Sequence, residues 1–211
     1  GAHRVIRYDT RGHGRSPVPP GPYALADLGR DALDLLDHLG VARAHVCGLS
    51  LGGMTAMWLA AFAPDRVDRL VLLCTSALLG PPSAWSSRAQ TVLDQGTEAV
   101  ADAVVDRWLT PAAGPASRTR LRAMIAATPA VGYAGACAAI ETMDLRSDLS
   151  RIAAPTLVVA GVNDPATPPP HGSAIAAAIP GARFVTVPGA HLASWEHPTV
   201  VNKLILEALR D

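Results

Sequence analysis

A serine flanked by glycines lies where its hydroxyl could act as a nucleophile. Residues 48–52 read Gly-Leu-Ser-Leu-Gly, between an apolar strand-like run at 44–49 and a helix-like run at 51–63. A sharp turn from strand to helix strains the serine backbone, admits only glycine at the two ends of the motif, and lifts the hydroxyl above a sheet. It also points the next amide, that of Leu51, at an incoming carbonyl. We therefore predict Ser50 as nucleophile and Leu51 as an oxyanion donor, with a plain helix N-cap serine as the alternative.

A serine nucleophile needs a base and a group that orients the base. Asp164 lies just beyond the strand-like run 156–162, and His191 just beyond the run 183–187. This is the chain order, serine then acid then histidine, in which such groups follow successive strands of a parallel sheet. We predict His191 as the general base and Asp164 as its orienting carboxylate. A turn aspartate before proline and a loop histidine are the alternatives.

Composition excludes several other function classes. No spacing of His, Asp and Cys suggests a metal site, and no G-x-G-x-x-G follows a strand-like run, so we predict neither metal nor cofactor. Eighteen basic residues balance 18 acidic ones, which gives no electrostatic footprint for nucleic acid or a membrane surface. No apolar stretch reaches the roughly 18 residues of a membrane span. Three cysteines, an odd number, favour a reducing compartment and predict a cytoplasmic protein.

Strand-like and helix-like runs alternate over most of the chain, which predicts a mostly parallel sheet with helices on both faces. The predicted strands are 4–8, 44–49, 67–75, 156–162 and 183–187, and the predicted helices include 25–39, 51–63, 99–109, 118–127, 173–179 and 199–209. Between 80 and 148 the sequence has helical segments and no strand signal, as expected of a helical cap. We therefore divide the chain into core (1–79), cap (80–148) and core (149–211).

With these residues in place, the chain resembles the 3-oxoadipate enol-lactonases, α/β-hydrolases of the β-ketoadipate branch of aromatic catabolism. The resemblance starts at Arg4 and includes the turn 7–14 and the nucleophile turn 47–53, which many α/β-hydrolases share. Its specific part is in the cap, at residues 85–89, 107–110, 132–134 and 144–146. It implies the α/β-hydrolase fold, catalysis through an acyl-enzyme, and a small lactone or ester as substrate.

The family pattern also includes a stretch ahead of Arg4, with the first strands and the loop that supplies a second oxyanion donor. Family topology places one of those strands between the runs 4–8 and 44–49. The sequence opens directly into the first of these runs, without an initiating methionine. We therefore expect an N-terminally truncated version of the fold.

The lactone of this family carries a carboxylate, so the resemblance implies a cation in the cap. Arg88, one helical turn after Trp85, is the candidate, with Trp85 as an apolar wall. A solvated arginine beside a packed tryptophan is the alternative. A general carboxylesterase or a cofactor-free perhydrolase would share the same triad, and a non-catalytic binding module is an alternative of a different class. The oligomeric state, including a homo-oligomer, stays open.

Overall fold

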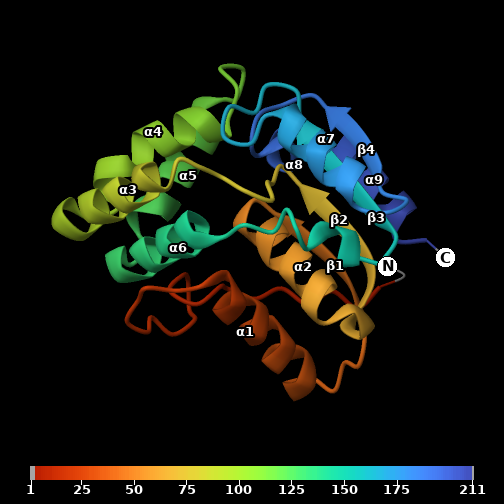
Figure 1. Ribbon diagram of the computed structural model, residues 1–211. Helices are drawn as coiled ribbons and strands as arrows, with labels where there is room; N and C mark the ends of the chain where they lie inside the picture. The colour runs from red at the N-terminus through yellow and green to blue at the C-terminus, as the bar shows by residue number, and fades with distance from the viewer. Residues whose placement is uncertain (1–2, 211) are drawn as a thin grey trace.

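Four parallel strands form the centre of the protein in a computed structural model that describes residues 3–210 (Figure 1). They lie side by side in chain order: β1 (Ala44–Leu49), β2 (Val67–Leu73), β3 (Thr156–Gly161) and β4 (Arg183–Val187). Every residue of β3 is buried, as is the apolar second half of β2. Such continuous apolar runs suit strands that helices cover on both faces. The predicted parallel sheet is confirmed.

Helices join the strands and cover both faces of the sheet. They are α1 (Leu25–His38), α2 (Leu51–Phe62), α3 (Pro82–Gln95), α4 (Glu98–Trp108), α5 (Pro115–Ala126), α6 (Ala130–Thr142), α7 (Pro169–Ala178), α8 (Ala193–Glu196) and α9 (Pro198–Ala208), with 3-10 turns at Pro64–Arg66 and Leu149–Arg151. On one face Leu72 and Val158 pack with Met57 of α2. Their neighbours in sequence, Leu73 and Val159, turn to the other face and pack against α9. This alternation gives the sheet two apolar cores.

Helices α3 to α6 form a separate group beside the sheet (Figure 1). All four lie within the segment 80–148, in which no described residue forms a strand. Apolar side chains of α4 and α5 pack into a small core of their own. No single helix in residues 3–210 is long and apolar enough to cross a membrane; α5 and α6 meet that test only as a pair, and they are bent by 95°.

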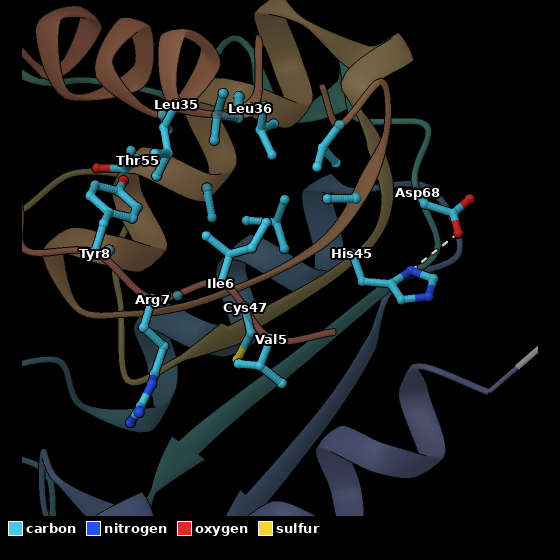
Figure 2. Close-up of a pocket in the computed structure, with 18 of the residues that line it drawn as sticks. Val5, Ile6, Arg7, Tyr8, Leu35, Leu36, His45, Cys47, Thr55 and Asp68 are labelled. Carbon is cyan, nitrogen blue, oxygen red and sulfur yellow. Dashed lines mark ion pairs between the residues drawn. The ribbon is translucent and has the colours of Figure 1, made fainter. Parts of the chain in front are cut away.

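The strand predicted at residues 4–8 is wrong, because this segment forms no regular secondary structure and pairs with no described strand. A cavity of about 950 Å³ lies between it and β1, the edge strand of the sheet. Leu35 and Leu36 of α1 and Thr55 of α2 point into this cavity (Figure 2). A strand needs a neighbour about 5 Å away to form its hydrogen-bonded ladder. The segment 4–8 has no such neighbour, because the cavity separates it from β1.

Candidate active site

Ser50 lies in the turn between β1 and α2 with a strained backbone. Its φ is 53° and its ψ −118°, in a region that non-glycine residues enter at a cost of about 1–3 kcal/mol. Two hydrogen bonds to the end of β2 hold this conformation. The Ser50 N–H donates to the Leu73 carbonyl at 3.0 Å, and the Thr75 hydroxyl donates to the Ser50 carbonyl at 2.7 Å. The sharp strand-to-helix turn predicted from the motif is therefore present.

Only one of the two motif glycines is required by the space around it. A Cβ at Gly48 would lie 2.1 Å from the Gly52 carbonyl oxygen, so no larger residue fits there. At Gly52 the prediction is wrong, since a Cβ would meet no atom within 4 Å. Gly52 faces open space because it borders two cavities. The second close approach is at Gly53, where a Cβ would lie 2.7 Å from the Thr75 Cβ.

The Leu51 amide lies at the start of α2, beside a cavity of about 290 Å³. The turn 8–13 forms the other wall of this cavity, through Tyr8, Asp9, Thr10 and His13. The first four N–H groups of a helix have no acceptor within the helix and carry its positive end. The amide is thus free of intrahelical bonds next to the strained serine, as an oxyanion donor has to be, and that role stays a prediction.

Asp164 and His191 form a buried pair at the ends of β3 and β4. The His191 Nδ1 lies 2.9 Å from the Asp164 Oδ2, and their side chains are 4% and 0% exposed. The Asp164 carboxylate also accepts from the Ala166 N–H at 2.8 Å, the Thr167 N–H at 3.0 Å and the Thr167 hydroxyl at 2.7 Å. A carboxylate can be buried only with this degree of hydrogen bonding.

The charge state of Asp164 fixes the tautomer of His191. Burial pushes the pKa of Asp164 up, but hydrogen bonds from His191 and Thr167 outweigh it and hold this pKa below its ordinary value. The carboxylate is therefore ionised at neutral pH and can only accept. The proton of the neutral imidazole must then be on Nδ1, which leaves Nε2 able to take a proton from a hydroxyl.

The structure brings Asp164 and His191 together, while no hydrogen bond joins the Ser50 hydroxyl to the His191 ring in the described chain.

Cys74, directly after β2, contacts both β3 and the loop that carries His191. Its N–H donates to the Val159 carbonyl at 2.8 Å, and its thiol lies 3.9 Å from the Ala190 carbonyl. Burial raises the pKa of Cys74 to about 11, so this thiol stays protonated and is a poor competing nucleophile.

Glu196 connects the histidine loop to the helices beside the sheet, a role that the sequence analysis missed. One of its carboxylate oxygens accepts from the Ala190 N–H at 2.8 Å. The other accepts from the Thr110 N–H at 3.0 Å and the Thr110 hydroxyl at 2.5 Å. Nearby, the Leu192 N–H donates to the Trp108 carbonyl at 2.9 Å. The sequence signal for Glu196 is an acid five residues after His191, in the short helix α8, and its partner Thr110 is 86 residues away along the chain.

Trp85 and Arg88 are in contact on α3. The Arg88 guanidinium lies over the Trp85 ring at 4.8 Å, and the Trp85 indole N–H donates to the Leu79 carbonyl at 2.7 Å. Trp85 also packs against the main core, so it is both a packed tryptophan and a support for Arg88. Their contact with substrate stays a prediction. No group of three or more His, Cys, Asp or Glu side chains in residues 3–210 could hold a metal ion.

The glycine contacts predict that Gly48→Ala destabilises the protein while Gly52→Ala does not. The new methyl at position 48 collides with backbone, which typically costs about 1–3 kcal/mol or more of unfolding free energy. At position 52 the methyl enters open space in a helix, where alanine is favoured over glycine by about 1 kcal/mol. Urea denaturation of both variants measures the difference, and equal stabilities would contradict this steric reading.

For Asp164→Asn we expect kcat to fall by about 10³–10⁴-fold, because an amide can donate to Nδ1 and so favours the wrong tautomer. The exposed Asp94→Asn is the control and keeps full activity.

The same residue predicts a pH dependence of stability. Because the folded-state pKa of Asp164 is depressed, the ionised carboxylate stabilises the folded protein fully above its unfolded pKa of about 4. This stabilisation is lost as pH falls through the folded pKa. The difference in free energy of unfolding between the native protein and Asp164→Asn therefore becomes smaller below about pH 4. A difference that grows there would contradict the Asp164–His191 interaction.

We expect Glu196→Gln to lower both stability and kcat. The amide leaves one N–H group of the loops without its acceptor, at a typical cost of about 1–3 kcal/mol. Because Ala190 precedes His191, the base then loses part of its support and kcat falls. Glu207→Gln, at a partly exposed glutamate on α9, is the matched control. Unchanged kcat in a destabilised Glu196→Gln would restrict Glu196 to a structural role.

Comparison with known proteins identifies the family of this fold. A family model described as the α/β hydrolase fold matches residues 2–198. The chain is 38% identical to 3-oxoadipate enol-lactonase 2 of Acinetobacter baylyi over 204 residues, which cover 95% of this chain and 76% of that protein. Among solved structures it resembles a hydrolase from Pseudomonas aeruginosa PA01, with a TM-score of 0.93 and 48% identity over 97% of this chain and 79% of the other. The enol-lactonase from Burkholderia xenovorans LB400 gives a TM-score of 0.95 and 40% identity over 97% and 80%. The chain therefore belongs to the α/β-hydrolase fold family and is similar, within it, to the 3-oxoadipate enol-lactonases.

Proposed function

We propose that the protein is a serine hydrolase that opens the ring of 3-oxoadipate enol-lactone to give 3-oxoadipate. Ser50 is the nucleophile, His191 the general base and Asp164 the group that orients it. The observation that carries the hydrolase assignment is the strained serine turn at the same sheet edge as the buried Asp164–His191 pair. The similarity to two named enol-lactonases supports the choice of substrate.

In the first half of the reaction the Ser50 oxygen attacks the lactone carbonyl as His191 Nε2 takes the hydroxyl proton. The Asp164 carboxylate stabilises the imidazolium that forms. The Leu51 N–H donates to the oxyanion, an interaction whose loss typically costs about 3–4 kcal/mol in the transition state. These steps need a proton acceptor at Nε2. The Nδ1–H of His191 donates to the Asp164 carboxylate, so Nε2 is left free to accept a proton.

Collapse of the tetrahedral intermediate breaks the ring C–O bond and releases an enolate oxygen. An enolate is a better leaving group than an alkoxide, so less proton donation from His191 is required at this step. Because the ester is cyclic, the leaving group stays attached to the acyl-enzyme, and the enolate takes up the proton that His191 holds as it becomes a ketone, which leaves the imidazole neutral. A water molecule then gives a proton to His191 as its oxygen attacks the acyl carbon, and His191 returns this proton to the Ser50 oxygen as 3-oxoadipate leaves.

We further assign residues 80–148 as a cap over the reaction site and residues 1–79 and 149–211 as the two parts of the core. The hydrogen bonds from Thr110 and Leu192 support this arrangement, since they join the helical group to the loop of His191. Trp85 and Arg88 of the cap would then contact the substrate. A cytoplasmic location and a small-molecule substrate complete the proposal.

A general carboxylesterase is the second candidate, since it would use the same three residues. The 48% identical Pseudomonas structure supports this second candidate, because that protein is named only as a hydrolase and not as a lactonase. A perhydrolase would share the triad as well. The strained serine turn argues against a binding module without catalysis. Such a backbone conformation costs free energy, and it is typically found where a catalytic site requires it.

The decisive experiment compares 3-oxoadipate enol-lactone with p-nitrophenyl acetate and labels the serine with a fluorophosphonate probe. We expect kcat/KM to be far higher for the lactone and the probe to label Ser50. Ser50→Ala should lose both labelling and at least about a thousandfold in kcat, because the nucleophile is gone. Ser83→Ala, at an exposed serine of α3, is the control.

Each other outcome has a distinct meaning. Faster turnover of p-nitrophenyl acetate would identify a general esterase. A native protein that is neither labelled nor active would point to the binding module. Normal turnover by Ser50→Ala would remove Ser50 as the nucleophile and with it the whole mechanism.

A further inference from the structure

His13 lines the cavity of about 290 Å³ that lies beside the start of α2. Leu51 and Gly52, which follow the predicted nucleophile, form one wall of this cavity, and the turn that contains His13 forms the other. The predicted oxyanion donor and a histidine outside the predicted triad therefore border the same space. None of the steps of the proposed reaction uses this histidine.

Backbone contacts hold the turn around His13 in a fixed conformation. The His13 N–H donates to the Thr10 carbonyl at 2.9 Å, and the His13 carbonyl accepts from the Ser16 N–H at 3.1 Å. Gly12, with a φ of 78°, lies against α6, where a Cβ at Gly12 would be 2.5 Å from the Gly132 Cα. The turn itself and the helical group thus both fix the position from which the His13 side chain projects.

A single hydrogen bond fixes the tautomer of His13. Its Nδ1 lies 3.2 Å from the Arg11 carbonyl oxygen, which can only accept, so Nδ1 carries the proton of the neutral ring. The Nε2 atom is then unprotonated and able to accept a hydrogen bond. No donor to this Nε2 occurs among residues 3–210, and the atom is not one of the buried polar atoms without a partner. His13 therefore has an accessible acceptor at the wall of the cavity.

The cavity is polar enough and large enough to hold ordered water. Tyr8, Asp9 and Thr10 add polar groups to its wall, and its volume is several times the roughly 30 Å³ that one water molecule takes up in the liquid. The Asp9 carboxylate accepts from the Arg15 N–H at 3.0 Å and lies against Gly14, so its charge is partly compensated within the turn. A water molecule that donates one O–H to a ring nitrogen in this wall has a second O–H to donate across the cavity.

We propose that His13 positions a water molecule as an oxyanion donor beside the Leu51 N–H. The water donates one O–H to His13 Nε2 and the other to the carbonyl oxygen that becomes negative when Ser50 attacks. This hydrogen bond strengthens as charge develops, so it stabilises the transition state more than the bound substrate. The inference rests on the proposed function, and it is distinct from the donor that the family resemblance implies ahead of Arg4.

The kinetic test removes the acceptor and keeps a ring at position 13. For His13→Phe we expect kcat for the enol-lactone to fall by about 10- to 100-fold with KM unchanged, below the roughly 10²–10³-fold loss for a direct oxyanion donor. His13→Gln has a side-chain carbonyl that can accept from the same water, so it restores part of kcat. His38→Phe, at an exposed histidine of α1, is the matched control and keeps full activity. Thermal unfolding is measured for each variant.

A labelling test separates this proposal from the proposed function. When a fluorophosphonate reacts with Ser50, the Ser50 oxygen bonds to phosphorus, fluoride leaves, and the phosphonyl oxygen takes the oxyanion position without any lactone. We expect the second-order rate constant of labelling to fall by about 10- to 100-fold in His13→Phe and to recover in part in His13→Gln.

Equal labelling rates in the native protein and His13→Phe, or equal losses of kcat in the Phe and Gln variants, would overturn the role of His13. A rise in KM with unchanged kcat would overturn it as well, because the group would then act on substrate binding alone. A labelling rate that depends on His13 in a protein with no lactonase activity would retain this role and reject only the proposed reaction.

Discussion

The buried carboxylate–imidazole pair at the carboxyl edge of the sheet is the interaction on which the rest of the site depends. An ionised Asp164 with a fully buried side chain is tolerable only because four hydrogen bonds reach it. Three come from its own turn, and the fourth requires the loop after β4 to lie directly against it. Gly161 permits this approach, since a Cβ there would lie 2.3 Å from the Ala190 carbonyl oxygen. The packing of β3 against β4 therefore also places the Asp164 carboxylate where it fixes the tautomer of His191.

The same sheet edge stores strain at two neighbouring positions. Ser50 and Cys74 are the described non-glycine residues with positive φ, and they follow adjacent strands. The hydrogen bond from Thr75 to the Ser50 carbonyl joins the two turns, so each supports the conformation of the other. Burial of the apolar side chains of β2 offsets the free-energy cost of the strained backbone at both residues. The backbone of Ser50 is in this way held rigidly at the carboxyl edge of the sheet.

The sequence predicts most of this arrangement because its signals are local. The motif around Ser50, the apolar strands and the loops that carry Asp164 and His191 are each visible over about ten residues or fewer. Helix α3 buries only Val92, and α6 is apolar nearly all round, so neither has the clear periodicity that would give its bounds. The run 4–8 has the composition of a strand, but pairing depends on a neighbour that sequence composition does not report. The prediction at Gly52 fails for a similar reason, because only the cavities beside this glycine show that a side chain there would have space.

Long-range polar contacts are the part of the site that sequence reasoning could not reach, and they join the loop of His191 to the helices beside the sheet. Glu196 and the Trp108 carbonyl fix the helical group to the residues on either side of His191. A shift of this helical group would therefore also move the backbone around His191. The position of the predicted base and the packing of α3 to α6 beside the sheet thus depend on one set of hydrogen bonds.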